Sequence, residues 1–594
     1  MIRLSLLLLT ALAAAIFTTG CKPEASAEKT EFKHKDNTVY ARLPADPDKL
    51  NPVLSTSVYA RAVNENMFQY LMSFDPQTLA LTPQLVKSGP VVEELTEGPL
   101  AGGVAYTYEI REEAQWDNGT PVTAKDFEFT LKALFNPVVK AASIRAYLDF
   151  IGALSIDPAN PKKFTVLANK KYILAEPVIG NLAVLPEYVY DPNGLLRSFP
   201  LDELAQPARA EELAKQDKAL TQFAEAFNAP QYSREKGFIS GSGPYAFEGW
   251  ETGQQIVLTR KKDWWGDKVP GSPPALAAFP EKLVFMIIPD QTATLTALKD
   301  QQIDVCGQID AKDFIGLRDN ESMKGLANLH TPSSLTYYFV GLNNKNPKLS
   351  DKRVRRALAH LVNVPDLIDN LFYGLGERIV GPFHPAKPYY NKGLQPIDFD
   401  PAKARELLAS AGWEDTNNNG IVDKEIGGQK VELELEYLIS NASNFARNQA
   451  LLFEDDARKA GVKVNIVPQE FTVLIDNAKK RNYEMYAGAW AQDPIVDDPK
   501  QLWHTESDTP DGGNRVSFNN QEADELIEKI RITLDEKERN KLYLRFQEII
   551  YEEQPYIFLM APLERIAISK RFTAKASVRR PGFFVNEFLL KSDK

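Results

Sequence analysis

Apolar and polar residues alternate over several short stretches of the chain, which is the pattern of half-buried β-strands. The clearest example is YTYEIR at residues 106–111. Two further stretches, QQIVLTRKK at 254–262 and KLVFMIIP at 282–289, are rich in residues that favour strands. We therefore expect strands at these three places.

Longer segments repeat their apolar residues with the period of an α-helix. Residues 350–362, SDKRVRRALAHLV, and residues 523–553 have this period, and the second segment should break near Thr533 into two helices. Another helix should start at Thr123, because Thr123 and Asp126 form a Ser/Thr-x-x-Asp/Glu capping motif. Helices and strands mix without strict alternation, so the sequence predicts an α/β chain with several sheets.

The start of the chain has the pattern of a signal peptide. Arg3 precedes an apolar run over residues 4–17, which is too short to cross a bilayer as a permanent helix. The run ends in TTGC at 18–21, which resembles the lipobox of bacterial lipoproteins, whose cysteine carries a diacylglycerol. We expect a signal peptide over residues 1–20 and lipid on Cys21. The alternative is an ordinary secretory signal with a chance cysteine.

The composition is that of an ordinary globular protein. The chain has 594 residues, 44% of them hydrophobic and 25% charged, which is enough for two or more domains. The net charge of −11 and the pI of about 5.3 argue against nucleic-acid binding, which needs a concentrated basic face. Residues 21–36 are polar and lack periodicity, and we expect them to form a flexible tether between lipid and fold.

Residues with the spacing of a catalytic site are not found. The sequence has no H-E-x-x-H, G-x-S-x-G or Walker motif. Cys306 is expected to be a buried small hydrophobe rather than a nucleophile, and without Cys21 it has no partner for an intrachain disulfide. The five histidines are scattered, with no pair at i, i+4: His34, His330, His360, His384 and His504.

One segment, DTNNNGIVDKE at 415–425, has the spacing of a calcium-binding loop. The twelfth position should be a bidentate Glu, but Ile426 stands there. The alternative is a tight Asn-Gly turn between a helix and a strand. Bound calcium would be structural, and the residues at loop positions 1, 3, 5, 6 and 9 are Asp415, Asn417, Asn419, Gly420 and Asp423.

Several segments together resemble the family 5 extracellular solute-binding proteins, the peptide- and nickel-binding components of ABC importers. Each segment alone is only moderately specific, but six of them follow the order of the family. They include YTYEIREEAQWDNGTPVTAKDFEFTLK, GSGPYAFEGWETGQQIVLTRKKDWWG and EEQPYIFL. The six segments are 50–86, 106–132, 241–266, 287–305, 337–358 and 552–559.

The resemblance implies a two-lobe fold of the periplasmic-binding-protein kind, type II, with mixed sheets and a hinge between the lobes. Lobe I would comprise residues 36–330, with an extra subdomain at 68–190. Lobe II would comprise residues 335–550. Residues 554–594 would return to lobe I.

Three acids follow an apolar stretch in YAGAWAQDPIVDDPKQLWH at 486–504. Asp498 precedes Pro499 and should cap a helix, and Asp497 is expected to face solvent. Asp493 lies three residues after Trp490. By resemblance, an Asp at this position receives the α-ammonium group of a bound peptide.

The resemblance also suggests three further ligand-binding residues. Phe471 and Trp490 would line the side-chain pocket of the peptide, and Arg447 falls near the place where dipeptide binders hold the carboxylate. The alternative for Phe471 and Trp490 is plain core packing.

The sequence therefore predicts a lipid-anchored, monomeric solute-binding protein that captures a peptide and delivers it to an inner-membrane ABC permease. It would work at the periplasmic or extracytoplasmic face, with no cofactor other than a structural calcium. Rival ligands are an oligosaccharide, a nickel chelate or another small solute. Rivals of another class are a secreted hydrolase that pairs Asp493 with Asp497, and an extracytoplasmic sensor or chaperone.

Overall fold

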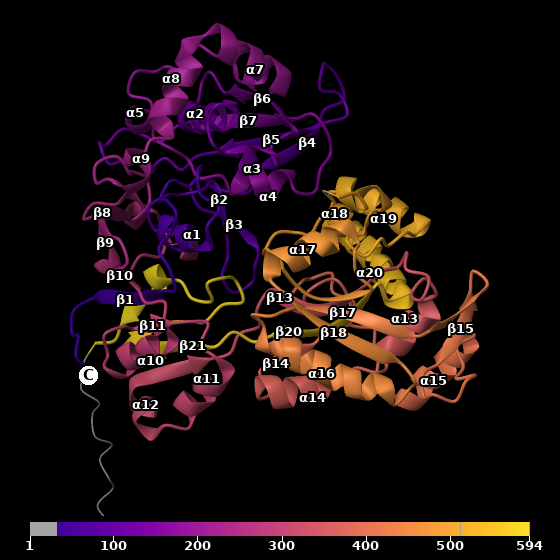
Figure 1. Cartoon of the computed structure of the whole chain (residues 1–594). Coiled ribbons are helices and arrows are strands. Elements are labelled where there is room, and N and C mark those ends of the chain that lie inside the picture. Colours follow the sequence, from indigo (N-terminus) through magenta and orange to yellow (C-terminus); the bar gives the residue numbers. More distant parts are fainter. Residues whose placement is uncertain (1–31, 272, 511, 593–594) are drawn as a thin grey trace, which may run out of the picture.

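A computed structural model describes residues 32–592 except Ser272 and Asp511. The expected signal peptide, Cys21 and the tether up to residue 31 lie outside the described residues. In Figure 1, lobe I forms the indigo to rose part on the left and lobe II the mainly orange part on the right. Among the helices of the described residues, none is both long enough and apolar enough to cross a membrane.

Lobe I is built on a seven-stranded mixed sheet of order β12-β21-β11-β1-β10-β9-β8. Strand β1 runs parallel to β10 and β11, whereas β8, β9, β12 and β21 pair antiparallel with their neighbours. The strands are β1 Thr38–Leu43, β8 Tyr245–Glu251, β9 Gln255–Arg260, β10 Lys282–Ile287, β11 Val305–Cys306, β12 Ala327–His330 and β21 Ile566–Ser569. The helices of this part include α1 Val58–Asn64, α10 Gln291–Lys299, α11 Ala311–Arg318 and α12 Glu321–Leu326.

The subdomain of lobe I has a four-stranded antiparallel sheet covered by helices. Helix α2 starts where the capping motif predicts, because Asp126 accepts the backbone N–H of Thr123 at 2.8 Å. Helices α6 to α8, up to Phe227, also pack here, beyond residue 190, the expected end of the subdomain. The elements are β4 Val91–Glu94, β5 Val104–Glu109, β6 Ile151–Ile156, β7 Lys163–Ala168, α2 Ala124–Phe135, α4 Ala175–Gly180, α6 Leu201–Leu204, α7 Pro207–Gln216 and α8 Lys218–Phe227.

Lobe II is built on a six-stranded mixed sheet of order β14-β20-β13-β19-β17-β18. The predicted break near Thr533 is confirmed, because α19 ends at Ile532 and α20 begins at Glu536. The strands are β13 Thr336–Leu342, β14 Gly376–Arg378, β17 Glu434–Ser440, β18 Lys463–Gln469, β19 Met485–Ala491 and β20 Tyr556–Pro562. The helices include α13 Lys352–Ala359, α15 Pro401–Ser410, α16 Asn444–Arg458, α17 Phe471–Lys480, α18 Lys500–Trp503, α19 Gln521–Ile532 and α20 Glu536–Glu553.

Two chain segments cross between the lobes side by side. One joins β12 to β13 and the other joins β20 to β21. Ser334 donates its N–H to the carbonyl of Pro562 at 3.0 Å, and Glu564 donates to Pro332 at 2.8 Å. Of the segment 554–594 expected to return to lobe I, residues 556–562 first run through the lobe II sheet as β20.

A third contact between the lobes lies away from the crossings. The loop after β7 brings Tyr172 and Ile173 from the subdomain against α19 of lobe II. The N–H of Ile173 donates to the carbonyl of Arg531 at 2.9 Å, and Ile173 is only 5% exposed in an apolar cluster made mostly of lobe II residues. This contact joins the subdomain to lobe II away from the crossings.

Candidate functional site

A cavity of approximately 350 Å³ lies where lobe I meets the end of β19. We call it the interlobe cavity. Lobe I contributes α1, the end of β1 and the C-terminal segment 579–587, and lobe II contributes residues 491–494. Its size lies within the usual range of small-molecule sites.

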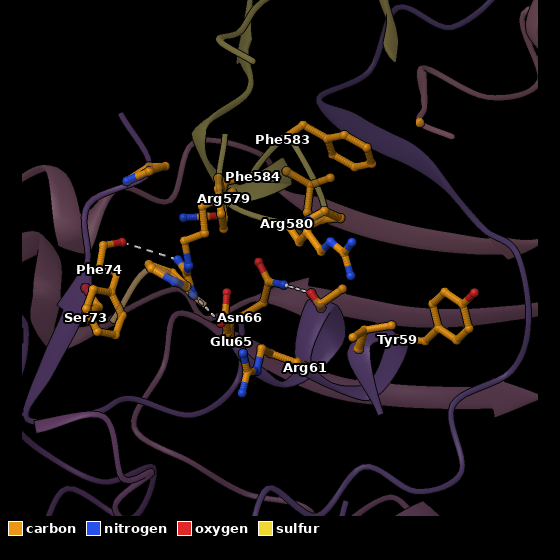
Figure 2. A pocket seen from close by; sticks show the side chains of 18 of the residues that line it. Tyr59, Arg61, Glu65, Asn66, Ser73, Phe74, Arg579, Arg580, Phe583 and Phe584 are labelled. Carbon is orange, nitrogen blue, oxygen red and sulfur yellow. Dashed lines mark hydrogen bonds and ion pairs between the residues drawn. The ribbon is translucent and has the colours of Figure 1, made fainter. Parts of the chain in front are cut away.

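The wall of the interlobe cavity combines aromatic rings with charged groups (Figure 2). Arg579 forms an ion pair with Glu65 and also donates to the carbonyl of Phe74 at 3.3 Å. Its guanidinium lies 4.8 Å above the ring of Phe584. Burial raises the pKa of the Glu587 carboxyl. In total the wall has four arginines and four carboxylates, so its formal charge balances.

Arg42 has a structural role at the floor of the interlobe cavity. The side chain is 5% exposed, and its three guanidinium nitrogens donate to three backbone carbonyls at 2.9–3.2 Å. These carbonyls belong to Ile288, Pro289 and Gly307. Arg42 therefore ties β1 to the loops after β10 and β11.

Asp493 lies on the wall of the interlobe cavity, two residues beyond β19. Its side chain is 73% exposed, and its carboxylate lies 3.9 Å from the guanidinium of Arg61 on α1. Asp493 and Arg61 thus face each other from the two lobes. The carboxylate is accessible to a cationic group of a ligand.

A buried lysine holds the loop that carries Asp493. Lys387 is 3% exposed, and its ammonium donates to the carbonyls of Asp493 and Ile495, each at 2.6 Å. The same ammonium lies 3.3 Å from the carboxylate of Asp497. The buried ammonium of Lys387 therefore holds the backbone of this loop in place.

The expectation that Asp497 faces solvent is wrong. Its carboxylate accepts a hydrogen bond from the hydroxyl of Tyr389 at 2.6 Å and pairs with Lys387. Burial raises the pKa of Asp497, while the nearby ammonium opposes that shift. Asp497 consequently stabilises the loop from inside lobe II, and this leaves Asp493 as the accessible acid.

Asp498 does more than cap a helix. Its Oδ1 accepts the N–H of Lys500 at 3.0 Å, as a residue at the start of α18 should, although Pro499 is the N-cap. Its Oδ2 accepts from Arg531 at 3.0 Å and from the hydroxyl of Tyr172 at 3.2 Å. Asp498 therefore also joins the subdomain of lobe I to lobe II.

The other three expected ligand-binding residues are not among the described lining residues of the interlobe cavity. Trp490 packs 6.2 Å from Phe339, centroid to centroid, under the guanidinium of Arg515. Phe471 begins α17 and is 58% exposed. Arg447 is exposed on the first turn of α16 and donates to the carbonyl of Asn441. The structure thus brings only Asp493, of these four, to the cavity.

The 415–425 loop forms a turn closed by its own side chains. Asp415 accepts the N–H groups of Asn419 and Gly420, and the amides of Asn417 and Asn419 both donate to Glu432 on the following hairpin. Glu432 is an acid that the loop pattern did not include. Asp423 is 3% exposed and accepts from Thr416, so its carboxylate points into the protein.

A second group of possible metal ligands lies beside α18. One ligand atom each from His504, Glu506 and Glu528 lies within 4.8 Å of the others. The ammonium of Lys500 already pairs with Glu506 at 3.0 Å and with Glu528 at 2.7 Å. Ion pairing with lysine accounts for these acids without a metal.

Sequence reasoning did not find the C-terminal part of the wall. Arg579, Arg580, Phe583 and Phe584 come from SVRRPGFF at 577–584, where two arginines and two aromatics surround Pro-Gly. This composition was the available signal. Glu65, the partner of Arg579, lies 514 residues earlier in the chain, and only the tertiary fold brings the two together.

The comparisons with known proteins agree with this architecture. The chain is 24% identical over 567 residues to the oligopeptide-binding protein AppA of Bacillus subtilis, covering 93% of this chain and 92% of AppA. It is 24% identical over 532 residues to the nickel-binding periplasmic protein of Escherichia coli, covering 86% and 87%. The solved structure of HbpA2 from Haemophilus parasuis superposes with a TM-score of 0.72 at 20% identity, covering 93% of this chain and all of that one.

The similarity to solved structures confirms the predicted fold class, an α/β fold of the periplasmic-binding-protein kind with mixed sheets. The family model for bacterial extracellular solute-binding proteins, family 5, matches residues 81–513. Because that match covers most of the chain, this protein belongs to family 5 of the bacterial extracellular solute-binding proteins.

Proposed function

We propose that this chain captures peptides between its two lobes and delivers them to the permease of an ABC importer. The observation that carries the proposal is Asp493, an accessible carboxylate on the wall of the interlobe cavity, where the two lobes meet. A carboxylate there suits the α-ammonium group that every unmodified peptide carries. The oligopeptide-binding relative supports the same ligand class.

A nickel chelate is the alternative that the relatives offer. The lining residues of the interlobe cavity in the described chain include neither histidine nor cysteine. Imidazole and thiolate are the side chains that most favour nickel-like metals. The wall therefore offers no direct ligand of this kind for a bare nickel ion, but a chelate brings its own ligands and is separated from a peptide only by the measurement below.

The proposal is tested by a thermal shift measurement. A ligand that binds only the folded state adds about 2.7 kcal/mol of stability at a hundredfold excess over Kd. A mixed di- to pentapeptide library should therefore raise the melting temperature of the protein. If oligosaccharides or nickel chelates raise it and peptides do not, the peptide assignment is wrong.

We further infer that Cys21 is lipidated and holds the protein on the outer face of a membrane. Its place at the end of a signal-like segment supports this, and so does a family described as extracellular. More than one acyl chain is needed for stable anchoring, which the lipoprotein modification supplies. Cys21→Ser should move the protein to the soluble fraction or leave its signal uncleaved; a cleaved Cys21→Ser protein that stays with the membrane contradicts the inference.

A further inference from the structure

Arg580 is a lining residue of the interlobe cavity whose guanidinium is largely unused. Its side chain is exposed, and within the described part of the chain its Nη2 donates one hydrogen bond, to Oγ1 of Thr336 at 2.5 Å. Within residues 32–592, leaving aside 272 and 511, it forms no ion pair with a carboxylate at 4.0 Å or less. A guanidinium has five N–H donors in a planar fork that matches a carboxylate.

The other three arginines of the wall each lie against a group of the protein, two of them through hydrogen bonds and Arg61 only through a loose ion pair. Arg42 donates to three backbone carbonyls, and Arg579 is paired with Glu65. Arg61 faces Asp493 at 3.9 Å. Figure 2 shows the guanidinium of Arg579 directed toward Glu65 and Phe74, while that of Arg580 points to the other side. Among the described residues, Arg580 is therefore the cavity arginine that combines free donors with no carboxylate within 4.0 Å, whereas Arg61 has free donors but lies beside Asp493.

The position of Arg580 relates it to Asp493. Thr336, which accepts its hydrogen bond, is the register partner of Ala491 in the β13–β19 ladder. Ala491 precedes Asp493 by two residues. A cationic and an anionic side chain thus lie near the same end of β19 and face one cavity.

We propose that Arg580 binds the carboxylate of the ligand, so that the interlobe cavity selects solutes with both a free ammonium and a free carboxylate. This inference rests on the proposed function and adds a specificity residue to it. Arg447, which the family resemblance suggested for the carboxylate, lies on α16 outside the described wall of the cavity. Carboxylate binding by Arg580 and carboxylate binding by Arg447 therefore predict opposite effects of the two substitutions on the affinity for peptides with a free C-terminus.

The probe is a mixed di- to pentapeptide library prepared in two forms, with free and with amidated C-termini. Each form is titrated into four proteins: wild type, Arg580→Gln, Arg580→Lys and Arg447→Gln. The rise in melting temperature with peptide concentration gives the apparent affinity. Amidation removes the charge-assisted hydrogen bonds of the carboxylate. Wild type should therefore bind the amidated library roughly 10- to 150-fold more weakly than the free library. Arg580→Gln should bind both forms with the affinity that wild type has for the amide, and Arg447→Gln should behave as wild type.

Arg580→Lys should recover part of the preference, because an ammonium keeps the charge but loses the planar fork. Unchanged binding of the amidated library by Arg580→Gln shows that this variant is folded. A preference that survives in Arg580→Gln, or that disappears in Arg447→Gln, overturns the inference. Equal binding of both libraries by wild type also overturns it while leaving the proposed function intact, whereas failure of both libraries refutes the proposed function itself.

Discussion

At the scale of single residues, Asp493 is the acid that the structure leaves accessible to a ligand. Replacing it by Asn removes the charge and keeps the shape. A charge-assisted hydrogen bond is worth about 1.5–3 kcal/mol, so peptide affinity should fall roughly 10- to 150-fold in a calorimetric titration. The melting temperature without ligand should hardly change, because the carboxylate is 73% exposed and lies 3.9 Å from Arg61.

The matched controls for Asp493→Asn are a second cavity acid and a blocked ligand. Glu564→Gln removes another carboxylate of the same wall and should leave peptide affinity within about threefold of wild type. N-acetylated peptides lack the cation and should bind wild type and Asp493→Asn equally weakly. Equal affinity of free and acetylated peptides for wild type would refute the ammonium contact.

At the scale of elements, the loop from Asp493 to Asp498 depends on Lys387. Lys387→Met leaves the Asp497 carboxylate and two backbone carbonyls without their cation, at a cost of about 3–5 kcal/mol in the free energy of unfolding. Chemical denaturation measures this cost. The double variant Lys387→Met/Asp497→Leu should recover part of it, because no unpaired charge remains.

The control for Lys387 is a lysine whose ion pair lies at the surface. Lys480 pairs with Asp476 one helical turn away, and both side chains are more than half exposed. Lys480→Met should change the free energy of unfolding by less than about 0.5 kcal/mol. A Lys387→Met protein as stable as Lys480→Met would contradict the structural role of the buried ammonium.

The sequence predicted secondary structure better than the contacts of the loop from Asp493 to Asp498. Apolar alternation and helical period correctly predicted strands such as β5, the start of α2 at Thr123 and the break after α19. They could not show that Asp497 turns away from solvent, because its partners Lys387 and Tyr389 lie 108 or more residues away and meet it only in the fold. The position of Asp493 beside the cavity needed the same tertiary information.

We also propose, at the scale of elements, that the 415–425 loop binds a structural calcium ion. Asp415 would supply a ligand, and Glu432 could replace the missing Glu at the twelfth loop position. Calcium should raise the melting temperature of wild type but not of Asp415→Ala, and a chelator should reverse it. Identical melting curves with calcium and with chelator would leave the loop as a simple turn.

At the scale of the whole molecule, the described residues join the lobes at the paired crossings, around the interlobe cavity, and where Tyr172 and Ile173 contact α19. The crossings keep the lobes connected whatever their angle. The third contact exists only when the subdomain and lobe II are close. It should therefore favour the arrangement in which Arg61 and Asp493 face each other across the cavity.

Weakening this third contact should open the molecule and reduce its affinity for every ligand by the same factor. Tyr172→Phe removes the hydroxyl bound to Asp498, and Ile173→Ser exposes the contact by placing a polar group among apolar side chains. If only the closed arrangement binds, apparent affinity falls in proportion to the closed fraction. A loss of about 1.4 kcal/mol corresponds to tenfold.

Small-angle scattering and peptide titration test this together. The double variant should have a larger radius of gyration than wild type without ligand, and saturating peptide should remove the difference, because ligand stabilises the closed arrangement. Tyr147→Phe, which alters an exposed tyrosine of the same subdomain, should leave both quantities unchanged.

Free, acetylated and amidated peptides should all lose affinity by one factor in the double variant, unlike the selective losses expected at Asp493 and Arg580. A double variant that binds peptide as wild type does, with an unchanged radius, would show that the Tyr172 and Ile173 contact does not control closure, and that the crossings alone set the angle between the lobes.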